Sequence, residues 1–476
     1  MRGRTVGLVA VLAAGFLDLL NVTVVNVALP RIITYLPASS AQAQGILTAY
    51  TLTFAVGLIT GARLGRMFGL RRVFVVGTLG FALTSLVCGL AGSAAVLIGA
   101  RAAQGLCAAV MVPQVLALIQ VMYPPAERAR PMAAFSGLLG AAASLGPIVG
   151  GLLADVGGPA NGWRAVFLVN VPIAVVAAVV AARRVPEERT ASTVGLDVPG
   201  LVVAAGAAVL LLGGLSALTA PATRVLGVGA VVVGVGLLVV FLAAQRAADR
   251  RGATPLVPLA LQGRGTFRAA TLTQLLFFVP VMGFSLVITQ YLQTYLGYTP
   301  LQSGLLVLPW SVLVGVGAGL GTTVLLPRLG RSVVSAGLLV MATGIAAVAA
   351  VIAAAAAPGP AWWALVPGVA VGGLGMGLVV APLLEIALSE VPVRLASEAS
   401  GVYNSVGQLS AALGFATLGA LYFAQTADTA ATDPVHVTAT ATALLTGAGV
   451  AVLAAVSTLA LPRRPAGRDP AVATAS

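Results

Sequence analysis

The chain has 476 residues, of which 59% are hydrophobic and only 8% are charged, and its mean hydropathy is +1.04. This composition is typical of a polytopic membrane protein and argues against a soluble enzyme. The net charge of +13 comes with 26 basic residues, all arginines, that are spread over the predicted loops, so we do not expect a nucleic-acid-binding protein.

Fourteen apolar segments of about 20 residues follow one another along the chain, each long enough to cross a membrane as a helix. They predict an all-α polytopic membrane protein with 14 transmembrane helices. We expect the spans near residues 6–29, 44–62, 73–93, 96–121, 132–154, 163–182, 198–218, 225–244, 269–292, 304–326, 333–355, 361–388, 400–424 and 438–461.

The arginines predict the orientation of these spans. An even number of spans puts both termini on one side, and 22 of the 26 arginines lie in segments on that side. Only Arg31, Arg164 and Arg224 lie on the other side, and Arg101 lies inside a span. Because cytoplasmic loops are enriched in basic residues, both termini are expected in the cytoplasm.

Two charged and turn-rich segments, 183–197 and 245–268, bracket the seventh and eighth spans. They divide the chain into a six-helix bundle (1–185), a two-helix insert with its flanking loops (186–262), a second six-helix bundle (263–462) and a disordered cytoplasmic tail (463–476). Paired bundles of this kind suit alternating access around a site near the middle of the bilayer.

The first span contains an acidic residue, Asp18, near its middle. A carboxylate at that depth costs several kcal/mol unless it is protonated, paired or hydrated, so it is a functional candidate by default. Asn21 lies on the same helical face. The alternative is that Asp18 only forms a structural hydrogen bond with a neighbouring helix.

Two further motifs lie in the first bundle. In the fourth span, Arg101 precedes Gln104 and Gly105; a guanidinium there has to pair inside the membrane, or else it extends to the outer interface. In the fifth span, small residues at helical spacing would let another helix approach closely, and a proline permits a bend. The alternative for this span is ordinary packing. Its residues are Gly140, Ser144, Gly146, Pro147, Gly150 and Gly151.

A transport cavity would be mainly apolar with a few polar and aromatic side chains. The candidates, some of which could instead belong to interfacial aromatic belts, are Asn21, Tyr50 and Phe54 in the first bundle and Gln290, Tyr291, Trp310, Tyr403 and Asn404 in the second. Glu385 is a possible second acid, or a solvated residue at the inner interface.

The remaining candidates favour structural roles. Cys88 and Cys107 lie in apolar segments and are too few for a disulfide framework or a zinc site, so no metal is expected. His436, in a polar segment with Asp428 and Asp433, is expected to be a solvated loop residue.

Over nearly its whole length the chain resembles the 14-span drug:proton antiporter branch of the major facilitator superfamily. Arg101, Gln104 and Gly105 match the fourth-span motif that this family associates with proton coupling. Weaker similarities occur in segments 23–30 and 161–172 and at Asp197 and Gly200. The residues that match its gating and antiporter motifs, the latter thought to seal the interface between the bundles, are Gly69, Arg71, Arg72, Gly140, Gly146, Pro147, Gly150 and Gly151.

The chain departs from this family at three positions. In the thirteenth span, Gly407 stands where relatives tend to have an arginine. Arg66 stands where the loop after the second span usually has an aspartate, so other contacts are expected to latch the inner gate. Asn21 stands where the first span usually has its aspartate. Asp18 is one turn away, so we expect the proton-coupling site to be shifted by about 5 Å toward the cytoplasm.

The resemblance implies a proton-coupled antiporter that exports amphiphilic drugs or antibiotics, not an enzyme. It implies a monomer in the bacterial inner membrane that uses the proton-motive force and no cofactor, with a small-molecule substrate, protons and lipid as partners. The single deep carboxylate favours neutral, zwitterionic or monocationic substrates. An uptake symporter, a non-transporting membrane sensor and an integral-membrane enzyme remain alternatives, whereas a chain without lysine cannot contain the usual nucleotide-binding loop of an ATP-driven pump.

Overall fold

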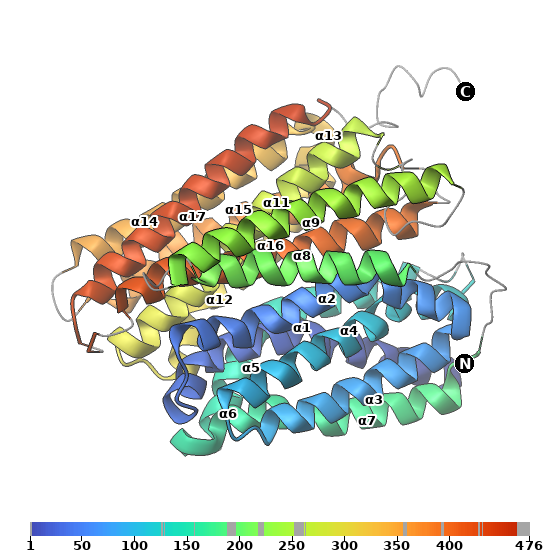
Figure 1. Cartoon of the computed structure of the whole chain (residues 1–476), viewed down its shortest axis with the longest axis horizontal. Helices are drawn as coiled ribbons and strands as arrows, with labels where there is room; N and C mark the ends of the chain where they lie inside the picture. Colours follow the sequence, from blue (N-terminus) through green and yellow to red (C-terminus); the bar gives the residue numbers. More distant parts are fainter. Residues whose placement is uncertain are drawn as a thin grey trace. The chain divides into compact units, whose positions relative to one another are not determined.

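The computed structural model describes residues 2–124, 127, 129–156, 158–187, 197–217, 223–251, 261, 263–355, 359–391, 395–426, 429–430 and 432–463. Every regular element in these ranges is a helix, which confirms the predicted all-α class (Figure 1). The predicted tail from residue 464 onward lies outside these ranges. Asp428 also lies outside them, as do five of the arginines used to predict the topology: Arg128, Arg189, Arg394, Arg464 and Arg468.

The chain forms two compact units, of which unit 1 comprises Met1–Leu218, Thr223–Leu256 and Thr299–Gly304. Within it α2 packs on α4, α3 packs on α4 and α7, and α1 packs on α5 and α7. Its helices are α1 (Arg2–Tyr35), α2 (Ser40–Phe68), α3 (Leu70–Gly89), α4 (Ala94–Met122), α5 (Ala129–Val156), α6 (Gly158–Leu168), α7 (Asn170–Arg184), α8 (Val198–Ala217) and α9 (Arg224–Arg250).

Unit 2 comprises Thr219–Ala222, Val257–Tyr298 and Leu305–Ser476. Within it α14 packs on α15 and α17, and α11 packs on α16 and α17. Its elements are α11 (Gly265–Gln290), which continues into the π-helical turn η3 (Tyr291–Tyr295), α12 (Pro300–Leu320) from Leu305 onward with η4 (Gly321–Leu325), α13 (Leu326–Leu329), α14 (Ser332–Ala354), α15 (Trp362–Leu388), α16 (Ala396–Thr426), α17 (Val435–Ser457) and η6 (Thr458–Ala460). The first turn of α12 belongs to unit 1.

Each predicted span has a helical counterpart, although the bounds differ. Among the described residues, 12 helices are long and apolar enough to cross a membrane, and the apolar helical segments of α5 and α8 (Leu145–Val156 and Pro199–Leu211) are shorter. The first span was predicted too short, since α1 continues through Pro30 to Tyr35. The sixth span is divided between α6 and α7, which meet at Val169.

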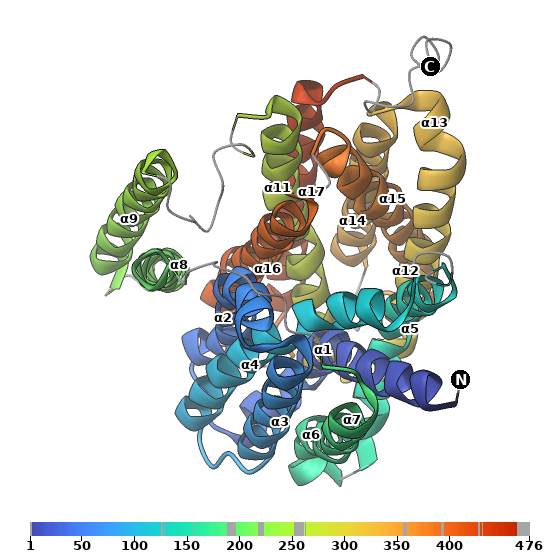
Figure 2. The ribbon, with the colours of Figure 1, turned by 90° about the vertical axis from the view of Figure 1, so that its right-hand side faces the viewer.

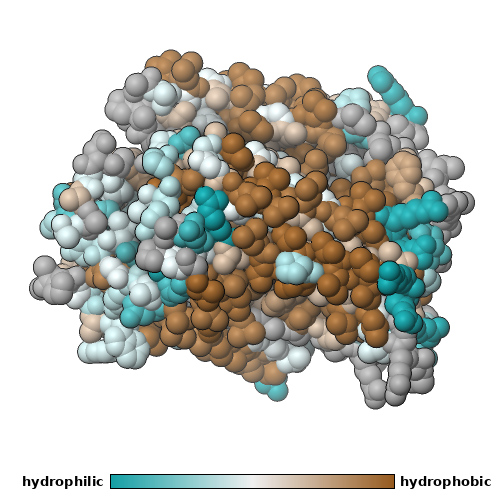
Figure 3. Space-filling view, turned by 90° about the horizontal axis from the view of Figure 1, so that it is seen from below, coloured by the Kyte–Doolittle hydropathy of each residue, from teal (hydrophilic) through white to brown (hydrophobic). Residues whose placement is uncertain are grey.

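The outer faces of many helices carry exposed apolar side chains, as expected for a surface that contacts lipid. On α9, Val225 and Leu226 are 84% and 73% exposed, and on α3, Val76 is 68% exposed. Figure 3 shows a broad apolar area on one face, with hydrophilic side chains toward its two ends. The chain is therefore a multi-pass membrane protein.

The helices α8 and α9 lie side by side and are joined at one end by a polar contact (Figure 2). Asp197 precedes α8 and accepts hydrogen bonds from the Gly200 N–H (2.9 Å) and from Gln245 Nε2 of α9 (2.6 Å). A Cβ at position 200 would lie 2.3 Å from Asp197 Oδ2, so a larger residue there would displace the Asp197 side chain. The sequence similarity at Asp197 and Gly200 thus corresponds to a helix cap.

The prediction for His436 was wrong. It lies in the first turn of α17 and is only 3% exposed, so it is not a solvated loop residue. Its polar neighbours in the sequence, including Asp433, precede the helix, whereas the His436 side chain itself packs among aromatic rings.

Candidate functional site

Asp18 lies on α1 inside unit 1 and is 5% exposed. Its Oδ1 accepts a hydrogen bond from the hydroxyl of Tyr50 on α2. Asn21, one turn further along α1, is 1% exposed, and its amide faces the Tyr50 hydroxyl without forming a hydrogen bond of normal geometry. The Tyr50 hydroxyl therefore faces both a carboxylate and an amide of the first span.

Arg101 lies on α4 and is 1% exposed. Its guanidinium carbon is 4.2 Å from the centre of the Tyr50 ring, a distance at which a cation is attracted by the ring face. Arg101 Nε donates to the carbonyl of Ile46 (3.2 Å), and Nη1 donates to Gln104 Oε1 (2.7 Å). This arrangement differs from that of an arginine extending to the membrane surface.

Gln104 continues the chain of contacts. Its Nε2 donates to the hydroxyl of Ser85 on α3 at 2.6 Å, and both side chains are fully buried. We call the five side chains of Asp18, Tyr50, Arg101, Gln104 and Ser85 the polar network. It contains one acid and one permanent cation and joins α1, α2, α4 and α3, so a proton gained or lost at Asp18 changes the charge of a water-poor site.

Gly105 explains how α4 comes close enough to α2 for this contact. A Cβ at position 105 would lie 2.3 Å from both the Tyr50 carbonyl oxygen and Thr53 Oγ1. Thr53 also donates to the carbonyl of Ala102 at 2.8 Å. The glycine thus permits a close helix contact one turn away from Arg101, which places the guanidinium over the Tyr50 ring.

Phe54 supports Tyr50 from the apolar side. The two rings stack with their centres 6.0 Å apart, and Phe54 is 3% exposed. Both belong to a buried apolar cluster that also contains Leu17 and Leu58. The polar network is therefore bounded by apolar side chains. Moving a charge from water into such surroundings carries a cost in free energy.

The glycines of α5 permit close packing against α1. A Cβ at Gly146 would lie 2.1 Å from Thr23 Oγ1, and one at Gly150 would lie 2.9 Å from Val24 Cα. Gly151 similarly approaches Leu301, in a segment that belongs to the same unit. Pro147 lies inside the helix. These glycines thus let α5 approach α1 closely.

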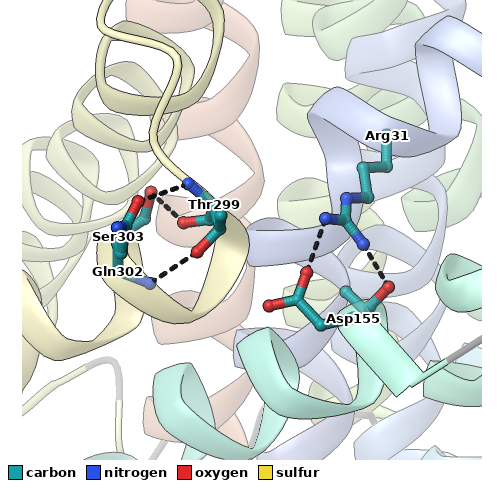
Figure 4. A network of polar contacts seen from close by, with 6 residues as sticks. Arg31, Asp155, Thr299, Gln302 and Ser303 are labelled. Carbon is teal, nitrogen blue, oxygen red and sulfur yellow. Dashed lines mark hydrogen bonds and ion pairs between the residues drawn. The ribbon is translucent and has the colours of Figure 1, made fainter. Parts of the chain in front are cut away.

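A polar contact near the ends of α1 and α5 accompanies this packing (Figure 4). Arg31 forms an ion pair with Asp155 Oδ1 at 2.5 Å and donates to the carbonyl of Ala154. The same figure shows the start of α12, where the Thr299 hydroxyl accepts from the Gln302 N–H at 3.2 Å.

The loop between α2 and α3 is fixed by Gly69, whose φ of 98° favours glycine. Arg71 donates from Nε to Glu187 Oε2 (3.0 Å) and from Nη1 to the Val185 carbonyl (3.1 Å). Arg72 Nε lies 3.5 Å from the same Glu187 oxygen. An acid in the segment after α7 thus pairs with both arginines of this loop.

The candidates in unit 2 have partners of their own. Trp310 stacks on Phe284 with ring centres 4.6 Å apart, and the Tyr403 hydroxyl donates to Gln274 Oε1 at 2.8 Å. Gln290 and Tyr291 are buried. Asn404 is exposed, and Glu385 is half-buried on α15.

Sequence reasoning missed two side chains at these sites. Ser85 gave no signal, because a single serine in an apolar span is common and its partner lies on another helix. Glu187 gave a weak one, because it is an acid in an arginine-rich segment, but its pairing with Arg71 and Arg72 depends on how α3 and α7 pack.

The Major Facilitator Superfamily profile matches residues 11–415. The probable actinorhodin transporter of Streptomyces coelicolor is 39% identical over 420 residues, covering 88% of this chain and 72% of that protein. The puromycin resistance protein pur8 of Streptomyces alboniger is 34% identical over 462 residues, covering 96% and 89%.

A solved structure has the same fold. The bacterial homologue of the human lysosomal transporter Spinster, in an inward-facing and unoccupied conformation, has a TM-score of 0.69 at 16% identity and covers 96% of this chain and 97% of that one. At this identity the similarity concerns the fold alone. With the profile match and the two relatives, we conclude that the chain belongs to the major facilitator superfamily, a family of membrane transporters and not of enzymes.

Proposed function

We propose that this protein exports amphiphilic drugs or antibiotics from the cytoplasm and exchanges them for protons by alternating access. Relatives that are named for actinorhodin transport, puromycin resistance and tetracenomycin C export support the substrate class. The observation that carries the coupling is the buried hydrogen bond from Tyr50 to Asp18, with Arg101 over the same ring. No cofactor is required, since the proton-motive force drives the exchange.

Asp18 is the proton carrier in this proposal. When ionised, it accepts the Tyr50 hydrogen bond in the field of the Arg101 cation; when protonated, it loses its charge and much of that attraction. Protonation from the outside and substrate binding from the inside compete at this carboxyl group, so export of one is tied to uptake of the other. Arg101 supplies the cation beside Tyr50, and Gln104 holds the Arg101 guanidinium in place. Both are positioning residues.

The membrane potential adds to the driving force. If each cycle moves one net positive charge inward, a potential of 100 mV contributes about 2.3 kcal/mol. This contribution would exceed the roughly 1.4 kcal/mol of a tenfold proton gradient. Export of a neutral substrate is therefore expected to respond to both potential and pH gradient.

The substrate cavity is assigned to side chains from both bundles. Asp18 is the one deep acid that we assign to the first bundle, so we favour neutral, zwitterionic or monocationic molecules. The proposed substrate residues are Asn21, Tyr50, Phe54, Gln290, Tyr291, Trp310, Tyr403 and Asn404. Glu385 remains a candidate for a second proton site.

The gates are assigned to the two remaining motifs. We place the inner gate at Gly69, Arg71 and Arg72, with Glu187 as the counter-charge that the usual aspartate would otherwise supply. We place the bundle seal at the glycines and proline of α5, including Gly146 and Pro147. The protein would act as a monomer in the bacterial inner membrane, with both termini in the cytoplasm and with α8 and α9 as a two-helix insert.

Transport in proteoliposomes tests the proposal. Purified protein is reconstituted, a proton gradient is imposed, and movement of a fluorescent amphiphilic cation and of puromycin is followed. Asp18→Asn is expected to abolish accumulation driven by the gradient while still allowing exchange of labelled for unlabelled substrate. Glu127→Gln removes an exposed acid, 60% accessible, and serves as the control. Full gradient-driven accumulation by Asp18→Asn would refute the assignment.

A further inference from the structure

The single histidine of the chain lies in an aromatic cluster of unit 2. His436 Nδ1 is 2.8 Å from the hydroxyl of Tyr422 on α16, and both side chains are buried. The ring of Tyr295, in η3, lies 5.9 Å from the His436 ring, and Tyr291 stacks on Tyr295 with ring centres 5.4 Å apart. Three helical segments thus converge on one imidazole.

Several polar atoms of α11, η3 and α17 are buried without a hydrogen-bond partner. They are His436 Nε2, Gln290 Nε2, the Tyr291 hydroxyl and the Thr440 hydroxyl, on side chains that are at most 3% exposed. A buried polar group without a partner is costly, so such a group in a folded protein marks a place where water, an ion or a ligand is expected. We call His436, Tyr422, Tyr295 and Tyr291 the histidine cluster.

We propose that the histidine cluster is a second proton-binding site, with His436 as the proton acceptor. Histidine is the side chain whose ordinary titration falls between about pH 5 and 8. In either neutral tautomer Nδ1 points at the Tyr422 hydroxyl. Nε2 is buried without a hydrogen bond of normal geometry, and the backbone of Ala430 lies near the ring. Water that reaches Nε2 can deliver a proton to the ring, which then has two N–H donors, and the Tyr422 oxygen accepts one of them.

Burial of the ring opposes protonation of His436, whereas the nearby charge of Asp433 favours it. Asp433 precedes α17; its carbonyl accepts the His436 backbone N–H (3.1 Å), and its carboxylate accepts the N–H of Val435 (2.9 Å). The facing groups on η3 and α16 are the neutral phenols of Tyr291, Tyr295 and Tyr422. Of the other helices that pack on α17, α14 contains no titratable residue, and α11 carries Arg268 in its first turn, at the end opposite η3. In the described surroundings no cation opposes protonation.

The position of the cluster suggests its role. It lies where α16 ends, α17 begins and α11 passes into η3. With both termini in the cytoplasm, these three ends face the outer side of the membrane. This role in transport rests on the proposed antiport, because protons then enter from that side. Protonation of His436 would make export depend on outer pH separately from Asp18.

A single histidine allows a direct measurement of proton binding. The full-length protein is purified with a tag that contains no histidine, labelled with ring-¹⁵N histidine and placed in lipid nanodiscs, so that the only ring signals come from His436. We expect one titration of both nitrogen shifts between about pH 5 and 8. Tyr422→Phe should move its midpoint and alter the tautomer ratio. Ring shifts that stay constant over this range would overturn the proposal.

Transport measurements distinguish a failure of the His436 proposal from a failure of the proposed antiport. In proteoliposomes, His436→Asn and His436→Gln are expected to flatten the dependence of export on outer pH while export driven by the gradient persists. Unchanged outer-pH dependence in both variants would overturn the role in transport. If wild-type export needs no proton gradient at all, the antiport proposal fails, while the NMR titration still decides whether His436 binds a proton.

Discussion

The guanidinium carbon of Arg101 lies 4.2 Å from the centre of the Tyr50 ring, and the hydroxyl of that ring donates to Asp18. One aromatic side chain is therefore shared by a cation on its face and an anion at its edge. A desolvated cation–ring contact is worth about 2 kcal/mol, and a hydrogen bond to a charged group about 1.5–3 kcal/mol. Both contacts thus contribute to holding opposite charges close together in an apolar surrounding.

Tyr50→Phe separates these two contacts, because it keeps the ring beneath Arg101 and removes only the hydroxyl. The ionised form of Asp18 loses its donor, so protonation becomes easier and export should continue to a higher pH on the side from which protons are taken. A loss of about 1.5–3 kcal/mol corresponds to a shift of roughly one to two pH units. The rate of gradient-driven export as a function of pH measures this shift.

Phe54→Leu is the matched control for Tyr50→Phe. It changes the ring that stacks on Tyr50 but leaves the hydroxyl and Asp18 untouched. We expect it to lower export without moving the pH profile. A Tyr50→Phe profile that coincides with the wild-type one would show that the hydrogen bond to Asp18 has no part in coupling.

Arg101→Lys tests whether the charge or the shape of the side chain matters. The guanidinium donates to Ile46 and Gln104 at once while it lies flat on the Tyr50 ring. A lysine keeps the charge but has no planar fork, so Gln104 loses a partner. Export should fall about tenfold, as the loss of one charge-assisted hydrogen bond implies. Export by the lysine variant at the wild-type rate would mean that the charge alone suffices.

The sequence made parts of the polar network predictable. Asp18 and Arg101 are single charges in long apolar segments. Charges in such segments are rare and mark functional sites, so the sequence pattern alone identifies them as candidates. Gln104 could be predicted as a neighbour of Arg101, because it lies three residues further along the same helix. The partners Ser85 and Ile46 could not be found, because one is a serine among many and the other acts through its backbone.

Helix ends and loop contacts were less predictable than spans. His436 was assigned to a loop because polar residues precede it, yet α17 begins one residue before it and its ring is buried by packing of η3 and α16. Similarly, α1 extends beyond its apolar core to Tyr35. Hydropathy locates the apolar centre of a span but not the turns that continue past it. Tertiary packing decides both cases.

Gly105→Ala should destabilise the contact between α4 and α2. The added methyl group would lie 2.3 Å from the Tyr50 carbonyl oxygen, which belongs to the backbone and has little room to move. Overpacking of this kind costs about 1–3 kcal/mol. Thermal unfolding in detergent should show a lower midpoint, and export should fall because Arg101 moves relative to Tyr50.

Gly99→Ala provides the control on the same helix, since a Cβ there meets no atom within 4 Å. Alanine is the better helix former by about 1 kcal/mol, so this variant should be as stable as the wild type or more stable. If both substitutions lowered the unfolding midpoint equally, close approach of α4 to α2 would not be the reason for Gly105.

The last prediction concerns the ion pairs of Glu187. This carboxylate is 18% exposed and lies 3.0 Å from Arg71 Nη2, whereas the Arg4–Glu127 pair is about 60% exposed on both sides and 4.0 Å apart. Because solvent screens exposed pairs, the second should contribute almost nothing and the first up to about 1 kcal/mol. Double-mutant cycles with Arg71→Gln and Glu187→Gln, and with Arg4→Gln and Glu127→Gln, measure both coupling energies from unfolding midpoints.

Transport of the Glu187 variant adds a second readout: if the pair latches the inner gate, Glu187→Gln changes the export rate by more than its small effect on stability explains. Equal coupling energies in the two cycles and unchanged export would leave Arg71 and Arg72 without a counter-charge that matters for gating.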